Sequence, residues 1–158
     1  MHATTFRPAI AFILIATSPF ITSAIGQNNP NPTAACPAAA EMDHQHLQGR
    51  WHATLQADSA GVVPQPDTSA WLQLGPHPEL AESVRGTVQR AGAIALLSGD
   101  VDEGELTLEE SIDGTHISAT WTGQVVDGSC GKEIQGTWTN AHPTTTLPFV
   151  LRKQAGWQ

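Results

Sequence analysis

The sequence predicts an all-β domain, an antiparallel up-and-down meander of eight strands that closes into a barrel. Apolar and polar side chains alternate along residues 115–153, which is typical of strands with one buried face. A pentapeptide of the form apolar-polar-Gly-polar-apolar recurs along the chain, and Gly-containing turns separate the predicted strands. Eight strands are enough to close a small barrel around side chains or one small ligand.

The pentapeptide occurs five times, and its spacing predicts the meander. The glycines stand close to multiples of about 12 residues apart, roughly the length of one strand and one tight turn. Each glycine lies on the same side of its strand as the two apolar residues. Inward glycine is typical of strands that bend strongly where a sheet closes on itself. The five are Gly49, Gly86, Gly99, Gly123 and Gly136.

The predicted strands follow from these positions. They span residues 51–57, 70–74, 83–90, 93–98, 105–111, 116–126, 133–139 and 147–153. Alternation predicts an inward face that is almost wholly apolar. Its predicted members are Trp51, Ala53, Leu55, Leu72, Leu74, Val84, Val88, Ile94, Leu96, Leu106, Leu108, Ile117, Trp121, Ile134, Trp138, Phe149 and Leu151.

The N-terminal region is predicted to direct export. Residues 1–26 have the positive Arg7, the apolar run 9–16 and small residues for cleavage, as in a secretory signal peptide. The alternative is an anchor helix, but the run is short for a membrane span of about 20 residues. Residues 27–46 are expected to form a flexible Pro/Asn/Ala-rich leader, with a helical turn or two near its end, before a barrel domain over 47–154. We expect a periplasmic or secreted protein.

The chain has two cysteines, and an exported chain favours their pairing. We predict a disulfide between Cys36 and Cys130 that fastens the leader to a turn. In the entropic model it would stabilise the fold by about 4–5 kcal/mol. The alternatives are two free thiols, or a lipid anchor at Cys36, which lacks the bulky aliphatic residue expected three positions upstream.

Charge excludes two classes of partner. The formal net charge of −8 gives no basic surface for nucleic acid or for an anionic membrane. We predict neither nucleic acid binding nor stable membrane insertion, and we expect a small apolar ligand or a protein as partner.

Gly49-Arg50-Trp51 on the first strand and Arg152 on the last resemble the calycin superfamily of lipocalins, fatty-acid-binding proteins and avidins. The resemblance implies a barrel with a Trp near its start and a basic residue of the final strand packed across that ring. Trp51 would close the barrel base, and Arg152, or else Lys153, would stack on it. The resemblance implies no particular ligand.

Two polar segments contain side chains of the kinds that bind metal ions. His44, His46 and His52 have a spacing at which imidazoles bind copper or zinc, but a solvated approach to the first strand is the preferred interpretation, and we predict no metal site. The acidic segment 99–111 begins like a calcium loop and then departs from that pattern. Glu105 and Glu109 are expected to face water on the same side as Thr107.

No nucleophile motif or phosphate loop is present in the sequence, so we predict no enzyme, no catalytic residue and no cofactor. His116 is expected on the surface. Trp51, Trp121 and Trp138 are the predicted ligand-binding residues, since Trp121 and Trp138 fall on neighbouring strands and could wall a cavity. The sequence therefore favours a binding protein. The alternatives are a packed barrel without a ligand, or an interaction or protease-inhibitor module that acts through its loops or leader.

Overall fold

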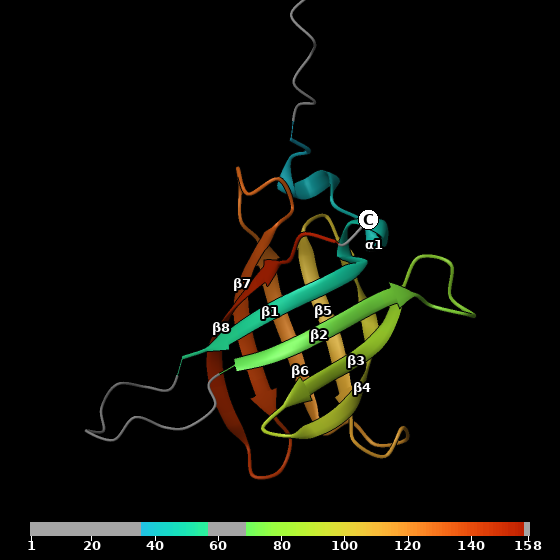
Figure 1. The fold of residues 1–158 in the computed structure, drawn as a ribbon, viewed down its shortest axis with the longest axis vertical. Helices are drawn as coiled ribbons and strands as arrows, with labels where there is room; N and C mark the ends of the chain where they lie inside the picture. The colour runs from blue at the N-terminus through green and yellow to red at the C-terminus, as the bar shows by residue number, and fades with distance from the viewer. Residues whose placement is uncertain (1–35, 57–68, 157–158) are drawn as a thin grey trace, which may run out of the picture. The chain divides into compact units, whose positions relative to one another are not determined.

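The computed structural model describes residues 36–56 and 69–156, and it shows a closed barrel of eight antiparallel strands in sequence order (Figure 1). The predicted fold class is confirmed. The predicted signal peptide, the leader up to residue 35 and the loop 57–68 lie outside the described residues. The strands are β1 (Gly49–Leu55), β2 (Ser69–Pro76), β3 (Val84–Arg90), β4 (Ala93–Asp102), β5 (Glu105–Ser111), β6 (Ala119–Val125), β7 (Glu133–Asn140) and β8 (Thr145–Lys153).

Residues 112–118 form a loop, although the sequence predicted that the sixth strand begins at residue 116. The Asp113 carboxylate explains the difference, because its Oδ1 accepts hydrogen bonds from the backbone N–H groups of Thr115 and His116 at 2.9 and 2.8 Å. These local bonds occupy donors that a strand would offer to its neighbour. β6 therefore starts only at Ala119.

Three residues of the predicted inward face point outward, and for these the prediction was wrong. Ile94, Leu96 and Ile117 are 64%, 38% and 49% exposed, and Ala95 and Leu97 are buried instead. In β4 the correct face is the one shared by Leu97 and Gly99 in the pentapeptide, because a shift of one residue turns every side chain of a strand to the opposite face.

The inward glycines allow neighbouring strands to approach closely. A Cβ on Gly136 would lie 2.0 Å from the Thr122 carbonyl oxygen and 2.4 Å from the Gly123 Cα, and one on Gly86 would lie 1.9 Å from the Gln73 oxygen. Gly123 and Gly136 face each other in the β6–β7 pairing. Side chains at these positions would collide with backbone, so the bending that the sequence predicted depends on glycine.

We expect Gly136→Ala to lower the free energy of unfolding by about 1–3 kcal/mol or more, because the added methyl group must displace backbone. The control is Gly75→Ala on the outer side of β2, where a Cβ would meet only the Arg85 carbonyl oxygen at 3.9 Å. Urea unfolding of both variants measures the difference. Equal stabilities would show that the β6–β7 pair relaxes without cost.

The segment before β1 packs against the barrel and is tied to it by a disulfide. Cys36 and Cys130 are bonded, as predicted, and Met42 and Leu47 are buried. The segment contains a 3-10 turn, η1 (Ala39–Glu41), and a short helix, α1 (His44–Leu47), where the sequence allowed one or two helical turns. Within residues 36–56 and 69–156, no helix is long and apolar enough to cross a membrane.

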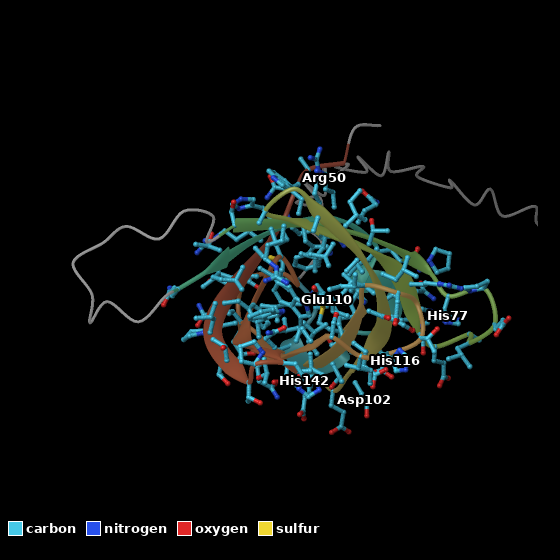
Figure 2. All side chains as sticks on the ribbon, turned by 90° about the horizontal axis from the view of Figure 1, so that it is seen from below. Arg50, His77, Asp102, Glu110, His116 and His142 are labelled. Atoms are coloured by element: carbon cyan, nitrogen blue, oxygen red, sulfur yellow. A yellow bond between two sulfur atoms is a disulfide. The ribbon has the colours of Figure 1, made fainter. Side chains whose placement is uncertain are left out.

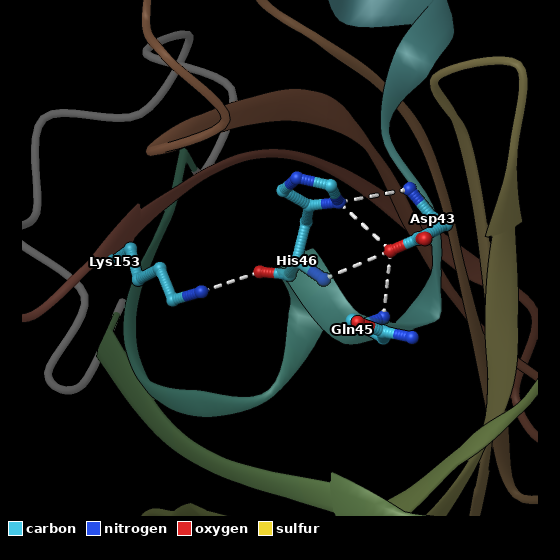
Figure 3. A network of polar contacts seen from close by, with 4 residues as sticks. All are labelled: Asp43, Gln45, His46 and Lys153. Carbon is cyan, nitrogen blue, oxygen red and sulfur yellow. Dashed lines mark hydrogen bonds and ion pairs between the residues drawn. The ribbon is translucent and has the colours of Figure 1, made fainter. Parts of the chain in front are cut away.

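Asp43 caps α1 (Figure 3). Its Oδ1 accepts from the backbone N–H of Gln45 at 2.9 Å and lies 2.8 Å from the His46 Nδ1. Burial raises the pKa of Asp43, but hydrogen bonds from His46 and Gln45 outweigh it and hold that pKa below its ordinary value. The cap satisfies backbone donors that a helix start leaves without partners.

α1 lies at the end of the barrel where β1 begins, and we call this end the base. Trp51 is buried there and donates from Nε1 to the Leu47 carbonyl oxygen at 2.7 Å. The cation over its ring is Lys153, with Nζ 5.4 Å from the ring centroid, and Nζ also donates to the His46 carbonyl oxygen (Figure 3). The preferred candidate Arg152 does not make this contact, because it pairs outside the barrel with Glu133 at 3.0 Å.

Candidate functional site

The end of the barrel opposite the base, which we call the mouth, carries the turn after β3 and the loops after β5 and β7. In the end-on view of Figure 2 the strands encircle Glu110. Glu110 is the next-to-last residue of β5 and is only 3% exposed. Burying a carboxylate in a barrel interior lowers the stability of the fold unless an opposite charge and hydrogen bonds offset the loss of hydration.

Three donors surround the Glu110 carboxylate. Trp121 and Trp138 donate from their indole Nε1 atoms to Oε2, at 3.1 and 3.2 Å. Arg90 donates from Nη2 to Oε1 at 2.9 Å and forms an ion pair with Glu110. Each of these residues belongs to a different strand, β3, β5, β6 or β7, so the barrel itself assembles the cluster. We call Arg90, Glu110, Trp121 and Trp138 the Glu110 cluster.

Arg90 covers the cluster on the side of the mouth. Its guanidinium carbon lies 4.2 Å from the centroid of the Trp138 ring, a cation–π contact. The side chain is 28% exposed, whereas the Glu110 side chain is 4% exposed. The Arg90 Nε is buried and has no hydrogen-bond partner among the described residues. The guanidinium is thus held by one hydrogen bond and one ring face, with part of its donor capacity unused.

The sequence-based prediction missed Glu110 although its signal was present. Leu106 and Leu108 were assigned inward, and the same alternation places Glu110 inward and Glu109 outward. The buried interior is almost wholly apolar, as predicted, and Glu110 is the one polar residue among the buried side chains of the described residues. The prediction for Glu105 and Glu109 is confirmed, since both are exposed to water together with Thr107.

The three tryptophans predicted to bind a ligand do not gather at one place. Trp121 and Trp138 are paired across β6 and β7, with ring centroids 6.4 Å apart, as expected for neighbouring strands. Phe149 lies 5.1 Å from Trp121, and all three rings are buried. Trp51 lies at the base. Both indole Nε1 atoms are hydrogen-bonded to Glu110, and Phe149 packs against Trp121.

A hollow of about 330 Å³ opens at the mouth between the loops 112–118 and 141–144. Ile112 and Ile117 contribute apolar surface to it and are 72% and 49% exposed. The remaining lining residues are Asp113, His116, Ser118, Asn140, Ala141 and His142. We call this hollow the rim pocket.

Hydrogen bonds shape the rim pocket. The Ser118 backbone N–H donates to the Glu110 carbonyl oxygen at 2.7 Å, and the Ala141 N–H donates to the Ser118 oxygen at 2.8 Å. The backbone N–H of His116, its side chain and the backbone N–H of Thr115 donate to Asp113, and these bonds hold the pKa of that carboxyl far below its ordinary range. The His116 side chain is exposed, as predicted. The loop is therefore tied to the strand that carries Glu110.

The histidines weighed as metal ligands are dispersed. His46 is bonded to Asp43, and the His52 ring lies 4.5 Å from the Trp71 ring on the outer face of β1 and β2. In the ranges 36–56 and 69–156, no three His, Cys, Asp or Glu side chains come together in a way that could hold a metal ion.

No protein-family model matches the chain, and no curated protein matches its sequence. Solved structures similar to it include a redesigned β barrel, with a TM-score of 0.45 and 16% sequence identity. That match covers 77% of this chain and 98% of the redesigned barrel. At this identity and TM-score the likeness carries no argument about this chain. The protein is a closed eight-stranded β-barrel with a buried carboxylate inside its mouth, paired with one arginine and two indole N–H groups.

Proposed function

We propose that this chain is an exported, non-enzymatic binding protein that holds an apolar group of a small ligand in the rim pocket. The observation that carries the proposal is the exposure of Ile112 and Ile117 around a hollow of about 330 Å³. Exposed apolar surface is hydrated at a cost, and covering it with an apolar group releases that water. The mouths of β-barrels are frequent ligand sites.

The proposal moves the ligand from the barrel interior to its rim. A ligand between Trp121 and Trp138 would have to separate two rings whose centroids lie 6.4 Å apart and whose Nε1 atoms both donate to Glu110. The rim pocket requires no such displacement. Its volume is at the lower end of the range of about 300–1,000 Å³ found for small-molecule sites.

Export is part of the proposal. The disulfide between Cys36 and Cys130 supports it, since structural disulfides persist in oxidising compartments. The calycin resemblance of Gly49-Arg50-Trp51 supports a binding role, with Lys153 in place of Arg152 over the Trp51 ring.

The test uses anilinonaphthalene sulfonate, a dye that becomes fluorescent on apolar surfaces. We expect the folded chain to bind the dye, and we expect the double variant Ile112→Asn/Ile117→Asn to lose at least about 1.4 kcal/mol of binding free energy, or tenfold in affinity. Fluorescence titration measures both dissociation constants.

The matched control is Ile94→Asn, which removes an isoleucine that is 64% exposed on β4 and does not line the rim pocket. Its dye affinity should equal that of the wild type. If Ile94→Asn weakens dye binding as much as Ile112→Asn/Ile117→Asn does, the dye binds exposed apolar side chains in general, and the rim pocket is not a specific binding site.

A protein partner is the second candidate, favoured by the 72% exposure of Ile112, which is more than a small ligand needs to cover. A protease inhibitor acting through its leader would belong to this class. Deletion of residues 27–35 separates a leader-driven inhibitor from a protein that binds at the rim pocket, because it spares Cys36 and the packed segment after it. The deletion should abolish inhibition driven by the leader and leave binding at the rim pocket unchanged.

A further inference from the structure

We propose that Glu110, Trp121 and Trp138 form a binding site for a guanidinium group of a ligand or partner. In the absence of that ligand, the guanidinium group of Arg90 occupies the site. The site is distinct from the rim pocket, and the inference does not depend on the proposal made for that pocket. A small ligand and a partner protein could both supply such a group, a planar cation that binds a carboxylate and an indole ring face at the same time.

The geometry shows that a guanidinium fits, because one is already bound. The Arg90 guanidinium donates to Glu110 at 2.9 Å and stacks on Trp138 at 4.2 Å. An indole ring face and a carboxylate are the two groups that attract a planar cation most strongly, the first through its quadrupole and the second through charge-assisted hydrogen bonds.

Groups other than Arg90 also hold the binding site in place. The two indole Nε1 atoms hold Oε2 of Glu110, which fixes the carboxylate and leaves Oε1 to the cation. Trp121 is further held by Phe149, at 5.1 Å between ring centroids. A displaced Arg90 would therefore leave an oriented, buried anion that requires another cation.

Arg90 is placed so that it can leave. It is the last residue of β3, and the following Ala91 and Gly92 form a turn with positive φ values of 50° and 79°. Its side chain is 28% exposed at the mouth, and it makes a single hydrogen bond to Glu110, to Oε1. Its buried Nε has no partner among the described residues. A free guanidinium is not attached to the backbone of β3 and can orient its donors toward Oε1 of Glu110 without that constraint.

The charge of the protein favours such a ligand. The formal net charge is −8, so cations are concentrated near the surface at low ionic strength. A guanidinium is also more weakly hydrated than an ammonium ion, which makes its transfer into the mouth less costly.

The test is a titration of the folded chain with ethylguanidinium, read from the indole ¹⁵N–¹H resonances of Trp121 and Trp138. Ethylurea, which has the same shape and no charge, is the control probe. We expect ethylguanidinium to shift both resonances to saturation and ethylurea to leave them unchanged. Glu110→Gln, which keeps an oxygen for the indoles and removes the charge, should abolish the shift.

Removing the Arg90 side chain should increase the affinity of the site for ethylguanidinium. The apparent affinity of the wild type is reduced by the fraction of molecules in which Arg90 occupies the site, so Arg90→Ala should bind ethylguanidinium about tenfold more tightly or better. Ile112→Asn/Ile117→Asn should leave this affinity unchanged, which separates the site from the rim pocket. If Arg90→Ala does not fold, the wild-type titration alone decides.

A second pair of probes identifies the source of the cation. A blocked tripeptide with a central arginine is compared with its citrulline counterpart. Equal affinities for the arginine peptide and ethylguanidinium indicate a free small cation, and a tighter peptide indicates an arginine of a partner protein. The proposal is overturned if wild-type resonances do not move, if ethylurea moves them equally, or if ethylguanidinium affects only Arg90→Ala, since Arg90 is then a permanent structural partner.

Discussion

Arg90→Met is expected to lower the free energy of unfolding by about 3–5 kcal/mol, because it leaves the Glu110 carboxylate buried and without its cation. Glu110 is 3% exposed, and Arg90 is the only cation within ion-pair distance of it in the described residues. The methionine conserves most of the volume that covers Trp138. The loss measured by urea unfolding therefore reports the charge of Glu110 rather than a cavity.

The matched control is Arg152→Met, which breaks the ion pair with Glu133 on the outer surface, where the Arg152 side chain is 56% exposed. Exposed pairs of this kind contribute about 0–1 kcal/mol. Adding Glu110→Gln to Arg90→Met should restore part of the lost stability, since the amide oxygen still accepts from the indoles. If Arg90→Met costs no more than Arg152→Met, water reaches Glu110 and the cluster is not a desolvated site.

The double variant Cys36→Ser/Cys130→Ser is expected to lose about 4–5 kcal/mol, the value of the entropic model for a loop of this length. The bond joins residues 94 positions apart, so its removal frees most of the unfolded barrel chain from a constraint. Equilibrium unfolding in urea measures the loss. The chain without the disulfide unfolds to a more open state, so the slope of its unfolding free energy against urea concentration should be at least as large as that of the oxidised wild type.

Reduced wild-type protein serves as the control for the two serines. It should match the double variant, because both lack the same bond. A double variant as stable as the oxidised wild type would mean that the buried side chains of Met42 and Leu47 are enough to hold the segment to the barrel.

Much of the fold could be predicted because its signals are local. Alternation and glycine spacing report which residues share a face, and β1–β8 follow them closely. The wrong placement of Ile94, Leu96 and Ile117 on the apolar face has two physical causes. In β4, residues 93–97 are apolar in succession, so alternation does not distinguish Ile94 and Leu96 from Ala95 and Leu97. At Ile117, the Asp113 carboxylate ends the alternation by capturing backbone donors.

The Glu110 cluster could be predicted only in part. Alternation places Glu110 inward, but nothing adjacent in sequence shows that it is compensated there. Its partners come from positions 90, 121 and 138, and they meet because the four pairings from β3 to β7 align them. The choice of Lys153 over Arg152 at the base has a simpler cause: Trp51 and Lys153 are register partners on β1 and β8, and the neighbouring residue necessarily points outward.

The pairing of β1 with β8 has a kinetic consequence. The other seven pairings join strands that are consecutive in the chain, whereas this one brings Trp51 to Lys153. Loop-closure entropy rises with the length of chain enclosed, so this seam should be the last to form during folding. Until it forms, both strands present unpaired backbone groups that can add a strand from another molecule. The period before closure is therefore when this protein is most prone to assemble with itself, and after closure none of the eight described strands keeps a free edge.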